Sequence, residues 1–352
     1  MTAESDTPDM RPTVQPDMQS GKQSGMQPDM KSGMKSGGQA EAMRAAVFAV
    51  SVPLPGCEDE ASAVQGGDRA CASPERTGQE HGPVRRIITM EALNALGVRH
   101  GWTARQLERQ ALRSGVMPER YVRNANHLDC AQQLCLLDAH VLLVGLGGLG
   151  GYVLELLARM GVGTITGADG DAFVPSNLNR QLLSDESRLH VPKAQAAADR
   201  VAVINSAVTF IPLCEYLSGE RMRALCRGKT LVVDALGGLQ YRLELQQAAA
   251  QAGVPMVTAA VGGLSGYVAV VMPGETGPAE LLGTGGAAED VLGTPAPVVA
   301  CAAALQCAEI MRLITGKHQA GGQGAPHAGA ERDRGILFFD LADRTFQNVR
   351  LG

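Results

Sequence analysis

The pattern of hydrophobic and polar residues changes near residue 120 of this 352-residue chain. After that point, apolar runs of strand length alternate with longer helix-like segments, and turn residues separate them. Such alternation predicts a doubly wound, Rossmann-like α/β fold, in which a mainly parallel sheet carries helices on both faces. The expected strands are 140–145, 164–169, 208–213, 230–235, 254–261, 266–272 and 336–340, and the expected last helix is 297–315, ending at Gly316.

Before residue 120 the pattern predicts two short amphipathic helices, Met90–Leu96 and Thr103–Ser114, and Thr103 fits the N-cap of the second. Two helices around a turn raise the alternative of DNA binding, since three arginines lie along one flank of the second helix. Glu108 interrupts that flank and the whole chain is acidic, so a small docking or capping subdomain is the favoured interpretation. The three arginines are Arg105, Arg109 and Arg113.

The first forty residues repeat a few polar residue types and cannot bury enough apolar surface to offset the entropy lost on ordering. Residues 41–85 are predicted to be an irregular linker, apart from a possible short strand at 45–52. The expected organisation is therefore a disordered tail and linker over 1–85, a small helical segment over 86–118 and a nucleotide-binding domain over 119–352.

Charge and composition exclude several classes of protein. The net charge of −5 provides no broad basic field, so a nucleic-acid partner is not expected. The N-terminus lacks a basic start followed by an apolar run, which predicts a cytoplasmic protein without a signal peptide. Eight cysteines without any CxxC pair are then expected to be reduced, and no zinc site is predicted. Cys301 and Cys307 lie on the expected last helix and are interpreted as small core residues.

One uncharged stretch, residues 252–274, is long enough to suggest a membrane span. It contains Pro255, Pro273 and the pair Gly262-Gly263, all of which interrupt helices. Two buried strands around a turn fit these breaks better, so no membrane association is predicted.

A glycine-rich turn follows the first predicted strand of the α/β region, in the sequence VLLVGLGGLGGYVLELLARMG. Without side chains there, a phosphate can approach the backbone, and the helix that follows offers free N–H groups and a partial positive charge. The next predicted strand ends at Asp169, which is placed to accept hydrogen bonds from ribose hydroxyls. This pattern predicts a nucleotide site at Gly145, Gly147, Gly148, Gly150 and Asp169, but it leaves both ATP and a nicotinamide dinucleotide possible.

A second motif, DGDAFVPSNLNRQ, begins at Asp169 and is followed by Val191-Pro192-Lys193 at the start of another helix. Hydride transfer does not need a second polar and cationic cluster around the nucleotide, whereas phosphate chemistry does. Arg180 and Lys193 could neutralise a triphosphate, and Asn177 could donate a neutral hydrogen bond to it. The motif therefore favours ATP.

These motifs, together with RYVRN at 120–124, resemble the ThiF/MoeB/HesA adenylyltransferases, which are related to ubiquitin-activating enzymes. The resemblance covers about residues 120–316 and continues weakly to Leu351. It implies that the glycine turn and Asp169 hold the adenosine, and that Arg123 reaches into the ATP site of a neighbouring subunit in a homodimer. The residues implied to hold the phosphates are Asn177, Arg180, Gln181 and Lys193.

The reaction implied by the resemblance is ATP-dependent adenylylation of the C-terminal carboxylate of a small ubiquitin-like sulfur carrier that ends in Gly-Gly, with release of pyrophosphate. Arg123, Arg180, Lys193 and magnesium would offset the repulsion between carboxylate and triphosphate. Family members usually carry DxxDN after the fourth strand, with the second aspartate helping to hold magnesium. Here Gly237 and Gly238 stand in place of that Asp and Asn.

The loss at Gly237 and Gly238 leaves two interpretations open. Either Asp171 and Asp234 hold magnesium and the enzyme is active, which is favoured, or the chain is a catalytically weak nucleotide-binding module that docks a ubiquitin-like partner. The zinc-binding cysteine pairs of many relatives are also absent from this sequence. An NAD-dependent oxidoreductase is the third alternative, and it is disfavoured because no acid or base is placed for hydride chemistry.

Overall fold

The computed structural model describes residues 36–54, 84–238, 241–282, 291–316 and 335–350. The described residues from Ala40 onward belong to one compact unit. The predicted tail up to residue 35, the predicted linker over 55–83 and a small polar loop expected at 321–330 lie outside the described residues.

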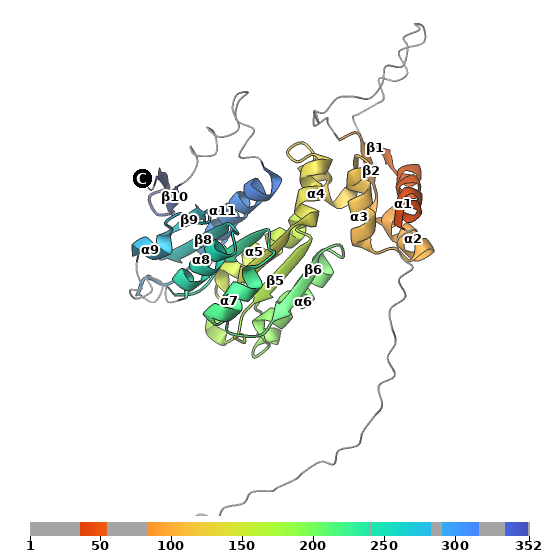
Figure 1. The fold of residues 1–352 in the computed structure, drawn as a ribbon. Coiled ribbons are helices and arrows are strands. Elements are labelled where there is room, and N and C mark those ends of the chain that lie inside the picture. Colours follow the sequence, from red (N-terminus) through yellow and green to blue (C-terminus); the bar gives the residue numbers. More distant parts are fainter. Residues whose placement is uncertain (1–35, 55–83, 239–240, 283–290, 317–334, 351–352) are drawn as a thin grey trace, which may run out of the picture. The chain divides into compact units, whose positions relative to one another are not determined.

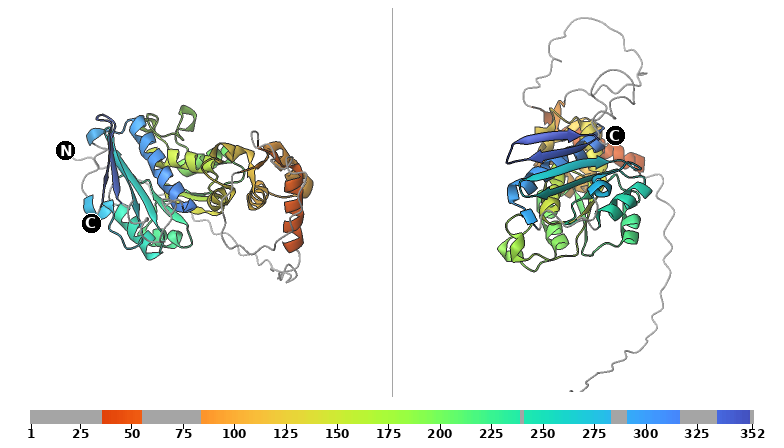
Figure 2. Two further views of the ribbon diagram at one scale, coloured as in Figure 1. Left: turned by 90° about the horizontal axis from the view of Figure 1, so that it is seen from above. Right: turned by 90° about the vertical axis from the view of Figure 1, so that its left-hand side faces the viewer.

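An eight-stranded sheet with strand order β11-β10-β9-β8-β7-β4-β5-β6 forms the centre of this unit (Figure 1). The five strands from β8 to β6 are parallel to one another, and β9, β10 and β11 extend the sheet as antiparallel strands (Figure 2). The predicted mainly parallel sheet is therefore confirmed. The strands are β4 (His140–Val144), β5 (Thr164–Ala168), β6 (Thr209–Leu213), β7 (Leu231–Asp234), β8 (Met256–Gly262), β9 (Ser265–Val271), β10 (Ile336–Asp340) and β11 (Thr345–Val349).

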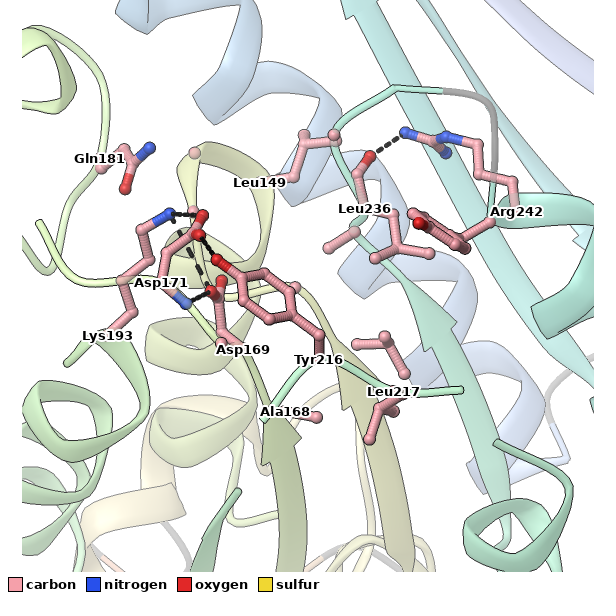
Figure 3. A pocket seen from close by; sticks show the side chains of 18 of the residues that line it. Leu149, Ala168, Asp169, Asp171, Gln181, Lys193, Tyr216, Leu217, Leu236 and Arg242 are labelled. Atoms are coloured by element: carbon pink, nitrogen blue, oxygen red, sulfur yellow. Dashed lines mark hydrogen bonds and ion pairs between the residues drawn. The ribbon is translucent and has the colours of Figure 1, made fainter. Parts of the chain in front are cut away.

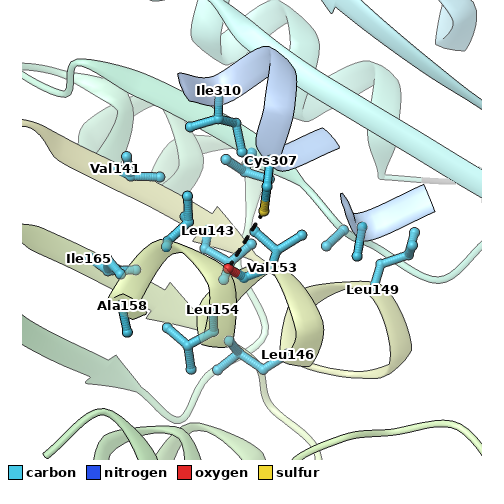
Figure 4. Packing of buried hydrophobic residues seen from close by; sticks show 14 of the residues in the cluster. Val141, Leu143, Leu146, Leu149, Val153, Leu154, Ala158, Ile165, Cys307 and Ile310 are labelled. Carbon is cyan, nitrogen blue, oxygen red and sulfur yellow. Dashed lines mark hydrogen bonds between the residues drawn. The ribbon is translucent and has the colours of Figure 1, made fainter. Parts of the chain in front are cut away.

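Successive residues of β4 point to opposite faces of the sheet, and each face has its own apolar core. Val141 and Leu143 pack with one set of helices, as Figure 4 shows, whereas Leu142 and Val144 pack with the other set. The first set is α4 (Cys130–Asp138), α5 (Gly148–Met160), α6 (Lys193–Ile204) and α11 (Ala296–Thr315), and the second is α7 (Gly219–Cys226) and α8 (Arg242–Gln251). Continuous apolar strands are what a sheet covered on both faces requires.

The uncharged stretch at 252–274 forms β8 and β9, so the preference for two strands over a membrane span is confirmed. Among the described residues, one helix, α11, is long and apolar enough to cross a membrane by length and composition alone. In the structure α11 packs against α5 and β8. Cys307 on this helix is buried and its thiol lies 3.8 Å from the carbonyl oxygen of Val153 (Figure 4), as expected for a core residue.

The segment before the large sheet forms a small α/β layer with its own core. Its helices are α1 (Ser36–Val50), α2 (Met90–His100) and α3 (Ala104–Arg113), and its strands are β1 (Val52–Pro53), β2 (Arg86–Ile88) and β3 (Val116–Pro118). Thr103 caps α3 in a capping box with Gln106, as predicted. The short strand predicted at 45–52 is wrong, because Met43 and Val47, one helical turn apart, are both buried in this core as part of a helix.

Helix α3 is joined to the large sheet by polar contacts. The guanidinium of Arg105 donates hydrogen bonds to the carbonyl oxygens of Gly163 and Leu137, at 2.8 and 3.0 Å. The buried carboxylate of Glu108 accepts a hydrogen bond from the Tyr121 hydroxyl, which lies on the short helix η2 (Glu119–Asn124). These contacts attach α3 to the rest of the unit and occupy Arg105 within the chain.

Candidate active site

The glycine turn after β4 is shaped by backbone contacts that exclude side chains. Gly145 has a φ of 93°, and a Cβ there would lie 2.4 Å from the carbonyl oxygen of Ala235. A Cβ on Gly150 would lie 1.9 Å from the carbonyl oxygen of Gly145. Helix α5 begins at Gly148 with Gly147 as its N-cap, and no side chain caps it. The free N–H groups of its first turn are thus available to an anion.

Asp169 follows β5 directly and is held by backbone donors. Its two carboxylate oxygens accept hydrogen bonds from the N–H groups of Leu146, at 2.7 Å, and Asp171, at 2.9 Å. Burial raises the pKa of Asp169, and the nearby ammonium of Lys193 and the two backbone donors offset part of that rise. Each oxygen keeps a lone pair for another donor, so the carboxylate can still accept a hydrogen bond from a ligand hydroxyl.

Lys193 and Asp171 form an ion pair beside Asp169. The Nζ of Lys193, at the first position of α6, lies 2.8 Å from an Asp171 oxygen and 4.0 Å from an Asp169 oxygen. The other Asp171 oxygen accepts a hydrogen bond from the Tyr216 hydroxyl. Burial alone would raise the pKa of Asp171, but the hydrogen bonds from Lys193 and Tyr216 outweigh it and hold that pKa below its ordinary value. The carboxylate of Asp171 therefore holds an ammonium inside the site.

Arg180 and Gln181 come from the loop after the short helix η3 (Pro175–Asn177). The Arg180 guanidinium donates to the carbonyl oxygen of Ser176, at 2.9 Å, and to the side-chain oxygen of Asn179, at 2.8 Å. Gln181 is only 7% exposed, and its side-chain oxygen has no hydrogen-bond partner among the described residues. A buried polar atom without a partner is unusual and indicates a group that a ligand or water would satisfy.

At the other end of the site, a buried ion pair organises the turn after β7. Asp234 accepts hydrogen bonds from Arg242, at 2.8 Å, and from the Thr258 hydroxyl, at 2.7 Å. Arg242 also donates to the carbonyl oxygens of Leu236 and Gly238. The ion pair thus fixes the backbone of the turn where Gly237 lies.

These elements enclose one cavity of about 660 Å³, a size typical of small-molecule sites. Figure 3 shows Lys193, Asp171 and Asp169 at one end, Tyr216 in the middle and Leu236 and Arg242 at the other end. The cavity lies where the parallel strands β4, β5, β6 and β7 end, which is where open α/β sheets bind their ligands.

Comparison with known families identifies the chain. The model of the ThiF family matches residues 121–351, which covers the whole large sheet and the cavity. The chain belongs to the ThiF family. The recognition of this family from the glycine turn and the DGDAFVPSNLNRQ motif is therefore confirmed.

Two relatives of this ThiF protein indicate what the family does. One is the molybdopterin-synthase adenylyltransferase of Salmonella typhimurium, 31% identical over 228 residues, which are 63% of this chain and 87% of the relative. The other is the sulfur carrier protein ThiS adenylyltransferase of Bacillus subtilis, 35% identical over 189 residues, which are 52% of this chain and 56% of the relative.

Solved structures agree with the ThiF fold. E. coli MccB crystallised with ATP matches 66% of this chain and 72% of its own, with a TM-score of 0.54 and 20% identity. The structure of PaaA covers the same shares with a TM-score of 0.51 and 20% identity. At this identity the likeness establishes the Rossmann-type fold.

The ThiF cavity contains most residues that the sequence predicted to bind nucleotide. Of the four predicted residues that do not line the cavity, three make packing or polar contacts within the protein and one lies on the surface. Gly150 packs under the turn, the Asn177 side-chain oxygen accepts a hydrogen bond from the Val174 N–H, and Asp234 is paired with Arg242. Arg123 is exposed on η2 and does not line the cavity. The predicted residues that line it are Gly145, Gly147, Gly148, Asp169, Asp171, Arg180, Gln181 and Lys193.

The wall of the cavity that follows β6 was not predicted from the sequence. Glu215, Tyr216 and Leu217 line the cavity directly after that strand, and Met222 of α7 completes the wall. A signal for them was present, since the carboxyl ends of neighbouring parallel strands meet at one edge of a sheet. Sequence analysis also gave no role to Arg242, which lines the cavity and holds the turn at Gly237.

Proposed function

We propose that this ThiF protein adenylylates the C-terminal carboxylate of a small ubiquitin-like sulfur-carrier protein, using ATP and releasing pyrophosphate. The observation that carries this proposal is one cavity that holds an uncapped helix N-terminus, two cations and a ribose-type acceptor, Asp169. Relatives whose names specify adenylyltransferases of such carriers support the reaction.

The cavity can orient ATP by charge. The N–H groups at the start of α5 and the cations Arg180 and Lys193 attract the triphosphate, while Asp169 accepts hydrogen bonds from the ribose. A carrier carboxylate that enters the cavity attacks the α-phosphorus. The bond between the α-phosphorus and the bridging oxygen breaks, and pyrophosphate leaves with that electron pair. The cations stabilise the charge that develops in the transition state, and no protein nucleophile is needed.

Lys193 changes partner in this scheme. In the structure its ammonium is bound to Asp171, 2.8 Å away, with Asp169 at 4.0 Å. A triphosphate carries more negative charge than one carboxylate, so it competes for the ammonium when it enters. Because Asp171 holds the lysine inside the site beforehand, little reorganisation is required during the reaction.

Magnesium would be held by an oxygen ligand of the protein together with the phosphates. Magnesium usually binds one or two carboxylates, water and substrate phosphates, and Asp171, at the cavity wall, fits one such ligand. Asp234 does not fit, because its carboxylate accepts hydrogen bonds from Arg242, Thr258 and the Leu236 N–H. Within the described ranges, no group of three or more His, Cys, Asp or Glu side chains is arranged as a metal site. The bound ion would neutralise phosphate charge.

A cytoplasmic homodimer and a Gly-Gly carrier tail complete the proposal. Arg123 is exposed and outside its own cavity, which is compatible with a role in the site of a second copy. Glycine residues at the end of a carrier would enter the cavity more easily than bulky side chains would.

Gly237 favours a second candidate function, a weakly catalytic module that binds nucleotide and docks a ubiquitin-like partner. Gly237 lines the cavity but provides no carboxylate where the family resemblance leads us to expect one. The same cations would bind ATP in such a module, and only turnover would be lost. An oxidoreductase role gains no support, since Arg180 and Lys193 would have no function in hydride transfer.

ATP–pyrophosphate exchange tests the proposal and separates the two candidates. The purified protein is assayed with magnesium and candidate Gly-Gly carriers, beside the variants Arg180→Ala and Lys193→Ala. A matched control is Arg188→Ala, a nearby surface arginine paired with Asp185 outside the cavity. Carrier-dependent exchange that falls about 100-fold or more in the two cavity variants, but not in the control, supports adenylylation. ATP binding without exchange for any carrier supports the weak module.

A further inference from the structure

Tyr216, an aromatic side chain just after β6, lies in the middle of the cavity wall (Figure 3). Although it lines the cavity, 77% of this residue is exposed. A large aromatic ring that is not buried on folding contributes little to the core, so most of its surface is open to contact with a ligand in the cavity.

The Tyr216 ring is fixed in place from two sides. A Cβ built on Gly170 would lie 2.6 Å from the ring, so the ring rests against backbone that only glycine leaves open. The hydroxyl at the edge of the ring donates a hydrogen bond to Asp171. One side of the ring is thus held by the protein while the rest is open to the cavity. Such pre-organisation lowers the entropy lost when a ligand binds.

The charges in the cavity determine which end of a nucleotide meets this ring. Lys193 and the N-terminus of α5 lie at the phosphate end, and Asp169 is the acceptor suited to ribose. The base then falls beyond Asp169, away from the cations. The cavity wall there is largely apolar and consists of Ala168, Tyr216, Leu217, Met222 and Leu236.

We propose that Tyr216 forms one wall of a base subsite and stacks on the base of the bound nucleotide, with Gly170 required as glycine to admit the ring. This assignment rests on the proposed nucleotide function. A purine overlaps the ring over a larger area than a pyrimidine does, so Tyr216 determines preference for ATP over pyrimidine nucleotides.

Equilibrium binding of ATP, UTP and inorganic tripolyphosphate to the full-length protein tests this assignment. Tyr216→Ala removes the ring, and Tyr216→Phe removes the hydrogen bond to Asp171 but keeps the ring. Phe346→Ala, an exposed aromatic on β11 outside the cavity, is the control for loss of any surface ring. Circular dichroism confirms that each variant is folded before binding is measured.

We expect Tyr216→Ala to weaken ATP binding about tenfold or more, as loss of one base stack does, and to narrow the preference for ATP over UTP. Tyr216→Phe and Phe346→Ala should stay within about twofold of wild type in ATP binding. Tripolyphosphate binding should be unchanged in every variant, because tripolyphosphate has no base for the ring to contact. Equal weakening of ATP and tripolyphosphate by Tyr216→Ala would overturn stacking in favour of an action through Asp171 and Lys193. Unchanged ATP binding in Tyr216→Ala would overturn only the stacking assignment, whereas wild-type protein that binds no ATP would overturn the nucleotide site as well.

Discussion

The buried ion pair between Asp234 and Arg242 allows a strong test of how the site is built. Both side chains are almost completely buried, with exposed fractions of 1% and 3%. Asp234→Asn keeps the shape of the side chain but leaves the Arg242 guanidinium buried without its counter-charge. Removing one partner of a buried pair typically costs about 3–5 kcal/mol. We expect a loss of that size in the free energy of unfolding.

Asp234→Asn should also weaken ATP binding in the cavity, because Arg242 holds the backbone of the turn at Leu236 and Gly238. Urea denaturation followed by circular dichroism measures the stability, and ATP titration measures the binding. Arg109→Met is the control, since its pair with Asp138 has side-chain exposures of 46% and 37% and should contribute less than about 1 kcal/mol. The double variant Asp234→Asn with Arg242→Met should be less destabilised than the sum of its single variants, since neither charge is left alone.

One result would refute this reasoning. Asp234→Asn protein with nearly wild-type stability, but without magnesium-dependent pyrophosphate exchange, would show that Asp234 acts on the metal ion. The magnesium role predicted for Asp234 from the sequence would then be correct, and pairing with Arg242 would not be the main role of this carboxylate.

Three further predictions concern the same unit. Gly150→Ala should lower the free energy of unfolding by at least about 2 kcal/mol and abolish ATP binding, because the added Cβ would lie 1.9 Å from the Gly145 carbonyl oxygen. Thermal unfolding measures the first effect and ATP titration the second. Alkylation of the native protein at pH 8, read by peptide mass spectrometry, should modify the exposed Cys214. It should spare Cys226, because burial raises the pKa of the Cys226 thiol to about 11. Equal alkylation rates at the two thiols would contradict the structure. Because the pKa of Asp171 is lowered, its ion pair contributes stability above the ordinary aspartate pKa of about 3.9. The difference in urea midpoint between wild type and Asp171→Asn should therefore close as the pH falls through the lowered pKa. A constant difference would show that the ion pair contributes no pH-dependent stability.

The sequence was sufficient to predict every strand of the large sheet except β11 (Thr345–Val349), and the glycine turn and acid that line one end of the cavity. Strand, glycine turn, helix and Asp169 are consecutive along the chain, so their positions follow from local geometry. Lys193 was also predictable, since it begins the helix that follows the same motif. These residues reach one site because β4 and β5 are adjacent parallel strands.

The positions of Tyr216, Arg242 and α1 could not be predicted from the sequence, because they depend on contacts between segments that are distant in the chain. Tyr216 follows β6, and its position depends on the absence of a side chain at Gly170. Asp234 matched the pattern of a ligand-binding acid at a strand end, but the sequence did not indicate that Arg242 would pair with it in the core. Helix α1 was missed because its stability comes from packing on α2 and α3, a tertiary effect that overrides weak local signals.

The most direct test of adenylylation follows each phosphate of ATP separately. The protein is incubated with magnesium, a Gly-Gly carrier and ATP labelled at either the α- or the γ-phosphate, and the carrier is isolated under acidic conditions that preserve an acyl-adenylate. We expect label on the carrier from α-labelled ATP and none from γ-labelled ATP, with the signal lost in Lys193→Ala. Label from γ-labelled ATP, or unlabelled carrier despite measurable ATP binding, would contradict it.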